Sequence, residues 1–224
     1  MRRATTLAAL IALLPSMAAA KELYRVDPSK PDGARLTMRD FADCLVFHEF
    51  PVRTRNIDAF LAISPMARNA DRLGEKLAVP DCLKSKDSSQ YIASLTMKPQ
   101  LLRGALFRSR FEKAFKGKAL PAFAPYDATD GWHFPSDDPF APLQMIGECA
   151  VRSSPGGTRA VIEAPVGSPA ENEAYRTVIP SLKACLPANN TYKFSRTVLE
   201  GLFAEAIYNL SVRASAPTTT KSEG

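Results

Sequence analysis

The sequence predicts an all-α protein made of two diverged copies of one four-helix, disulfide-linked unit, packed as one compact domain or two small ones. Apolar residues recur with the period of a helix, whereas the alternation typical of strands is rare. Serine–proline pairs stand where helices are expected to start. The four cysteines fall into two pairs of nearly equal spacing.

Residues 1–20 have the layout of a secretory signal peptide. Arg2 and Arg3 precede a short apolar run, and Ala18-Ala19-Ala20 supplies small residues before the expected cleavage site. No later segment is long and apolar enough to span a bilayer. The sequence therefore predicts a periplasmic or secreted protein with no transmembrane segment in its mature chain. An extended polar lead-in is expected at 21–36, and a disordered tail at 214–224.

The cysteines indicate two structural disulfides. Cys44 and Cys82 are 38 positions apart, and Cys149 and Cys185 are 36 apart. Four cysteines allow three pairings, and paired cysteines are the default in an oxidising compartment. The near-equal spacing favours one bridge within each unit, Cys44–Cys82 and Cys149–Cys185. The chain has no C-x-x-C, which argues against a redox motif and a zinc site.

Other landmarks recur in the same order in the two expected repeats, 37–115 and 142–213. Each has a Ser-Pro pair between its cysteines and a leucine directly after the second cysteine. Gly104 and Gly201 occupy matching places in the last helix of each repeat. A glycine inside a helix costs about 1 kcal/mol relative to alanine. The matched pair therefore predicts a helix crossing at each glycine; the alternative is a glycine that was inherited and is merely tolerated.

In the first repeat, Thr37 is expected to cap a helix over 38–49. The residues Phe41, Cys44, Leu45 and His48 form its buried stripe at helical spacing. A second helix start is expected at Ser64-Pro65.

In the second repeat, Ser168-Pro169 predicts a capped start, with Glu171 placed to close a capping box. The last helix has an apolar stripe from Val198 to Leu210, with Glu200 and Glu205 expected on its solvated side.

The connector, 116–141, is rich in proline, aspartate and aromatic residues. A connection this long in a compact protein is either functional or a packed strap. If the chain binds a small ligand, Tyr126, Trp132 and His133 are the first candidates. The alternative is an aromatic strap that covers the join between the repeats.

A basic stretch with interleaved aromatic residues runs from Lys98 to Lys118. As an amphipathic helix it would offer a possible contact to an anionic envelope surface through Arg103, Arg108, Arg110 and Lys113. The alternative is an ordinary solvated face with the aromatic side chains in the core.

No constellation in the sequence indicates catalysis. The net charge of +6 is mild, and no concentrated basic stripe suggests a nucleic-acid partner. Only two histidines are present, the zinc-protease helix and the phosphate-binding loop are absent, and neither a metal nor a cofactor is expected. The function is therefore expected to be that of a structural or interaction protein. A small-molecule carrier, with its pocket at the repeat interface or the connector, and an enzyme of unknown class are the alternatives.

The chain also resembles a group of small exported bacterial proteins. The resemblance rests on Cys-x-Val, a Ser-Pro helix start, Cys-Leu, and Leu102-Arg103-Gly104-Ala105-Leu106, and the second copy departs from it at Glu200. It implies an architecture and a compartment, and no mechanism.

Overall fold

The computed structural model describes residues 30–48, 51–83, 97–126, 133–188 and 192–215. All regular structure in these ranges is helical, which confirms the all-α prediction. The elements are α1 (Pro31–Phe47), α2 (Pro51–Leu61), α3 (Ala70–Glu75), the 3₁₀ helix η1 (Pro80–Leu83), α4 (Pro99–Phe115), α5 (Ala141–Ser153), α6 (Pro155–Glu163), α7 (Pro169–Ala184) and α8 (Arg196–Ser215).

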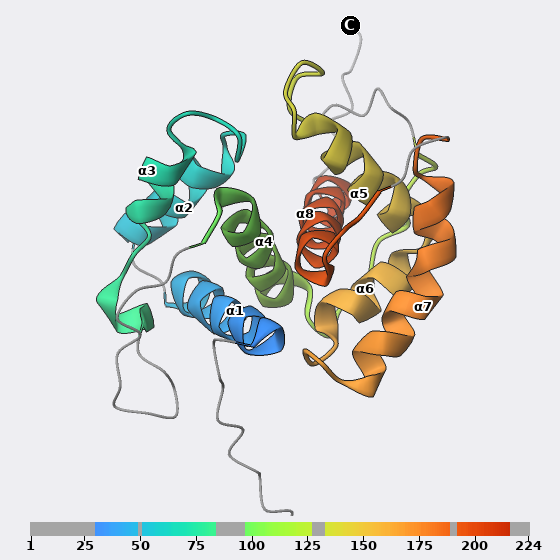
Figure 1. Cartoon of the computed structure of the whole chain (residues 1–224), viewed down its shortest axis with the longest axis horizontal. Helices are drawn as coiled ribbons and strands as arrows, with labels where there is room; N and C mark the ends of the chain where they lie inside the picture. The colour runs from blue at the N-terminus through green and yellow to red at the C-terminus, as the bar shows by residue number, and fades with distance from the viewer. Residues whose placement is uncertain (1–29, 49–50, 84–96, 127–132, 189–191, 216–224) are drawn as a thin grey trace, which may run out of the picture.

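Two long helices, α4 and α8, pack against each other at the centre of the molecule (Figure 1). Helices α1 to α3 pack against α4 and form with it the N-terminal half. Helices α5 to α7 lie on the other side and form with α8 the C-terminal half. No described helix is long and apolar enough to cross a bilayer.

The central helices cross at Gly104 of α4 and Gly201 of α8. A Cβ atom built on Gly104 would lie 2.5 Å from the Cα of Gly201, and one built on Gly201 would lie 2.9 Å from the Cα of Gly104. Only hydrogen fits between the two backbones, so both positions need glycine despite its low helix propensity. This is the crossing that the matched glycines predict, and it joins the two halves.

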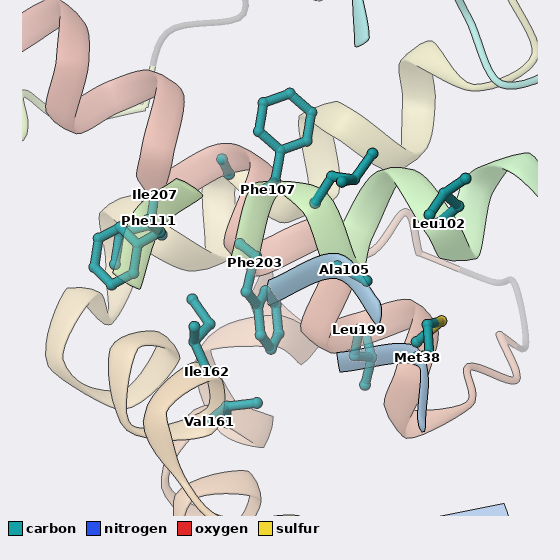
Figure 2. Packing of buried hydrophobic residues seen from close by; sticks show 14 of the residues in the cluster. Met38, Leu102, Ala105, Phe107, Phe111, Val161, Ile162, Leu199, Phe203 and Ile207 are labelled. Carbon is teal, nitrogen blue, oxygen red and sulfur yellow. The ribbon is translucent and has the colours of Figure 1, made fainter. Parts of the chain in front are cut away.

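Buried side chains of both halves form one continuous core around this crossing (Figure 2). Phe111 of α4 and Phe203 of α8 are completely buried, and Ile162 of α6 lies in the same cluster. A core of this kind is stabilised by the removal of apolar area from water. The described residues therefore form one packed unit, although the duplication of its two halves stays a prediction.

Both disulfides form as the cysteine spacing predicts. Cys44 of α1 bonds to Cys82 of η1, and Cys149 of α5 bonds to Cys185 at the end of α7. Each bridge ties the first helix of its half to the segment that precedes the central helix.

The predicted start of the first helix was wrong. Helix α1 begins at Pro31, inside the expected extended lead-in, and Thr37 is a buried residue of the helix and does not cap it. Charged residues such as Arg35 and Arg39 make this part of the sequence look polar. Both are in fact buried through ion pairs, which a hydrophobic pattern does not reveal. At the other end, His48 is exposed and does not extend the buried stripe.

The two Ser-Pro pairs behave differently. The Oγ of Ser168 accepts a hydrogen bond from the backbone N–H of Glu171 at 3.1 Å, which confirms the predicted cap of α7. Ser64 begins no helix; it lies in a turn where its Oγ accepts from the N–H of Met66, and α3 starts at Ala70. The expected signal peptide lies outside the described residues, as does the tail beyond Ser215.

Candidate functional site

A cavity of about 550 Å³ opens where α1, α4 and α8 begin, and we call it the three-helix cavity. Apolar side chains form most of its wall: Pro31, Ala34 and Met38 of α1, and Met97 and Leu101 at the start of α4. Ser195, Arg196 and Thr197 add the beginning of α8. The cavity therefore lies between the two halves.

Helices α1 and α4 begin in the same way. Each has a lysine at the N-cap, Lys30 or Lys98, followed by a proline at the first helical position, and neither has a side-chain cap. Proline is well suited to this position because its fixed φ matches the helix. Ser195 caps the N-terminal end of α8, because its Oγ accepts from the N–H of Val198 at 3.3 Å.

A buried network of ion pairs borders the cavity. The guanidinium of Arg35, which lines the cavity, contacts Glu171 of α7 and donates to Glu200 of α8 at 3.0 Å. Arg39, one helical turn further along α1, donates from Nε to Glu200 at 2.8 Å and from Nη1 to the carbonyl of Ala164 at 2.9 Å. These bonds fix α1 against both α7 and α8.

Glu171 has no solvent exposure. Burial by itself raises the pKa of its carboxyl, but the hydrogen bonds from Arg35 and from the N–H of Gly167 outweigh it and hold the pKa below the ordinary value. In the expected capping box, the carboxylate of Glu171 would accept from the backbone N–H of Ser168. In the structure it accepts from the N–H of Gly167 instead. Burial also lowers the pKa of Arg39, although the guanidinium stays charged beside Glu200.

Arg196 joins the network from the other side of the cavity. Its Nη1 donates to Glu171 at 3.2 Å and its Nη2 to Asn172 at 2.8 Å, while the side chain remains 47% exposed. Its guanidinium also lies over the ring of Tyr175. Lys98, the N-cap residue of α4, is exposed and makes no ion pair with any described residue.

A second buried pair lies on the far side of the glycine crossing. Arg103 donates from Nε and Nη2 to the two oxygens of Glu205, at 2.8 Å each, and from Nη1 to the carbonyls of Leu61 and Ile63. Gln144 of α5 donates to the same carboxylate at 2.6 Å. The carboxylate and all three guanidinium nitrogens thus have hydrogen-bond partners away from water.

Two of the four residues expected on a basic surface are not on it, whereas Arg110 is half-buried and Lys113 is exposed, so a contact through these two stays a prediction. Arg103 and Arg108 are buried, and Arg108 pairs with Asp43 and Glu112. Arg110 pairs with Asp58, and the Nζ of Lys113 donates to the carbonyl of Val46 at 3.0 Å. The basic residues of α4 serve mainly internal contacts.

Glu200 and Glu205, expected on a solvated face of α8, are buried as well. Sequence periodicity assigns charged residues to the solvent unless their partners are known, so it misplaces both.

The described connector candidates, Tyr126 and His133, do not line this cavity. Tyr126 is exposed, and Trp132 lies outside the described residues. The Nε2 of His133 lies 2.6 Å from the Oε2 of Glu148, a completely buried carboxylate that also pairs with Arg152. Burial raises the pKa of Glu148, but His133 and Arg152 outweigh it and lower the pKa overall. Through Glu148, His133 attaches the end of the connector to α5.

Four of the eleven residues that line the cavity, Pro31, Asp32, Ala34 and Arg35, lie in the expected lead-in, so the position of this wall was not predicted. One signal was present: Pro31 followed by Asp32 is a helix-start pattern of the same kind as Pro99 in α4.

Among the described residues, no group of three or more potential ligands could hold a metal ion. Comparisons with protein-family models, with curated proteins and with solved structures found no match for this chain.

Proposed function

We propose that the chain is an exported, non-catalytic carrier that holds a small and mainly apolar ligand in the three-helix cavity. The observation that carries this proposal is an apolar wall around about 550 Å³ at the junction of the two halves. Ligand sites in proteins have volumes of about 300–1,000 Å³ and are lined mainly by apolar side chains with a few polar groups.

The wall of the cavity is held in place by ion pairs and a disulfide, which favours a binding site over a packing defect. Arg35 is held by two carboxylates from different helices, and the Cys44–Cys82 bridge holds the far end of α1. A cavity whose walls are already ordered costs a ligand less conformational entropy on binding.

Export is supported by the layout of residues 1–20 and by the two disulfides, since bonds of this kind persist in oxidising compartments. The periplasm or the cell exterior is therefore part of the proposal.

The competing proposals are a structural or interaction protein and an enzyme. No histidine or cysteine lines the cavity, so the hydroxyls of Ser195 and Thr197 have no base of that kind beside them. This leaves the enzyme as the least supported of the three.

A neutral apolar dye, N-phenyl-1-naphthylamine, tests the carrier proposal because its fluorescence rises in an apolar site. The oxidised wild-type chain is expected to bind the dye at one site. Ala34→Trp places an indole in the cavity and is expected to abolish the signal. Ala59→Trp, at an exposed position of α2 away from the cavity, is the matched control and should bind like the wild type.

Equal dye binding by Ala34→Trp and the wild type would contradict the carrier proposal. Native mass spectrometry of the purified chain then separates the alternatives, because a carrier retains a small molecule whereas an interaction protein retains a second polypeptide.

A further inference from the structure

We infer that the ligand is an amphiphile with one negatively charged head group, such as a medium-chain carboxylate, whose head lies near Lys98. This inference rests on the proposed function and adds the chemical class of the ligand.

The first argument is the charge of the cavity wall. Three basic residues, Arg35, Lys98 and Arg196, line it, against one acid, Asp32. Asp32 itself lies 3.5 Å from Arg35, and Arg35 is further matched by Glu171 and Glu200. Lys98 is left without a carboxylate among the described residues.

The charge of Arg196 is only partly matched. It shares the carboxylate of Glu171 with Arg35, and its second contact is the neutral amide of Asn172. Because nearly half of its side chain is exposed, it can interact with a further anion in the cavity.

The second argument is the direction of the surrounding helices. Helices α1, α4 and α8 have 17, 17 and 20 residues, and all three direct their N-terminal ends toward the cavity. The N-terminal end of a helix carries a partial positive charge, which favours an anion. In α1 and α4 no side chain caps the first turn, so these helix ends add to the positive potential of Lys98.

The third argument concerns the rest of the ligand. Met38, Met97 and Leu101 form the apolar part of the wall. Methionine is flexible and polarisable, and it packs well against chains of varied shape. A wall of this composition fits an alkyl chain or an apolar ring, and it offers little to a sugar or a nucleotide. Charge and apolar surface together therefore select an amphiphile over a purely polar anion.

Three probes with the same ten-carbon chain test the inference. Decanoate, decanol and decyltrimethylammonium, each below its micelle concentration, compete with N-phenyl-1-naphthylamine for the full oxidised chain at neutral pH. Decanoate is expected to displace the dye at a concentration about tenfold lower than decanol, because one charge-assisted contact is worth about that factor. The cationic probe is expected to be the weakest.

Lys98→Gln removes the unmatched charge without breaking a described ion pair. We expect it to weaken decanoate about tenfold and to leave decanol unchanged. Lys98→Arg should restore most of the preference. Lys76→Gln, at an exposed position outside the cavity, is the matched control and should retain it.

The outcomes separate the two proposals. Equal displacement by decanoate and decanol, or a decanoate affinity unaffected by Lys98→Gln, would overturn the anionic head group and leave the carrier in place. Failure of all three probes and of the dye to bind would overturn the carrier itself, since all share an apolar body.

Discussion

Arg103 and Glu205 form a bidentate ion pair across the crossing of α4 and α8, with both N···O distances at 2.8 Å. Arg103 directly precedes Gly104, and Glu205 follows Gly201 by four residues. Glu200, which directly precedes Gly201, lies 3.6 Å from Arg108, which follows Gly104 by four. Matching positions of the two helices thus carry opposite charges. Helix α4 would face like charges if it were paired with a second α4, so the charges favour its pairing with α8.

Removing one member of the Arg103–Glu205 pair is expected to cost several kcal/mol of stability, because the other charge is left buried. Arg103→Met leaves a buried carboxylate with Gln144 as its remaining partner, and removing one member of a buried pair costs about 3–5 kcal/mol. Arg110→Met, on the same helix, breaks a more exposed pair with Asp58 and should cost less than about 1 kcal/mol. Urea unfolding measures both. Similar losses for the two variants would contradict the importance of the buried pair.

The glycine crossing predicts a destabilising alanine. Gly104→Ala puts a methyl group within 2.5 Å of the opposite backbone, and α4 and α8 must move apart. The expected loss is about 1–3 kcal/mol or more, despite the better helix propensity of alanine. Gly156→Ala in α6 is the control, because no atom lies within 4 Å of its new methyl group. It should be neutral or slightly stabilising by thermal unfolding.

Glu171 predicts a loss of stability in acid. The pKa of its carboxyl is lowered in the folded chain, so its pairing with Arg35 contributes fully at neutral pH. The contribution is lost as the pH falls below the ordinary value of 4.5 and through the folded-state pKa. Glu171→Gln should therefore destabilise the chain more at pH 7 than at pH 3.

Glu173→Gln is the matched control for this pH dependence, because Glu173 lies on the same helix and is exposed. It should change the urea midpoint little at either pH. An equal effect of Glu171→Gln at pH 7 and pH 3 would contradict the prediction.

The disulfides predict two comparable contributions. Their sequence separations are 38 and 36 residues, and closing loops of this length stabilises a fold by about 4 kcal/mol in the chain-entropy model. Replacing either pair by serine, Cys44 with Cys82 or Cys149 with Cys185, should lower stability by that order in urea. Far-UV circular dichroism checks that the variants remain helical.

The sequence was most informative where a residue has one structural use. Cysteine spacing predicted both bridges, Ser168 predicted its cap, and Gly104 with Gly201 predicted the crossing. Each of these depends on local geometry or on a residue type that few other roles require.

The buried charges could not be predicted in this way. Arg35 and Glu200 are 165 positions apart, and either one alone has the pattern of a solvated helix face. Their burial depends on a partner that only the tertiary fold supplies. For the same reason the sequence suggested a pocket at the repeat interface without indicating that Arg35 lines it. The start of α1 at Pro31 was not predicted either, because the first part of this helix lacks an apolar stripe.

The confinement of each bridge to one half has a consequence for biogenesis. The first bridge can close once Cys82 has been made, before any of α5 to α8 exists. Until α8 is made, however, Gly104 of α4 has no helix packed against it and Arg103 lacks its carboxylate partner, Glu205. The N-terminal half can thus oxidise early but completes its folding late, and a nascent chain at that stage is the form most in need of a chaperone.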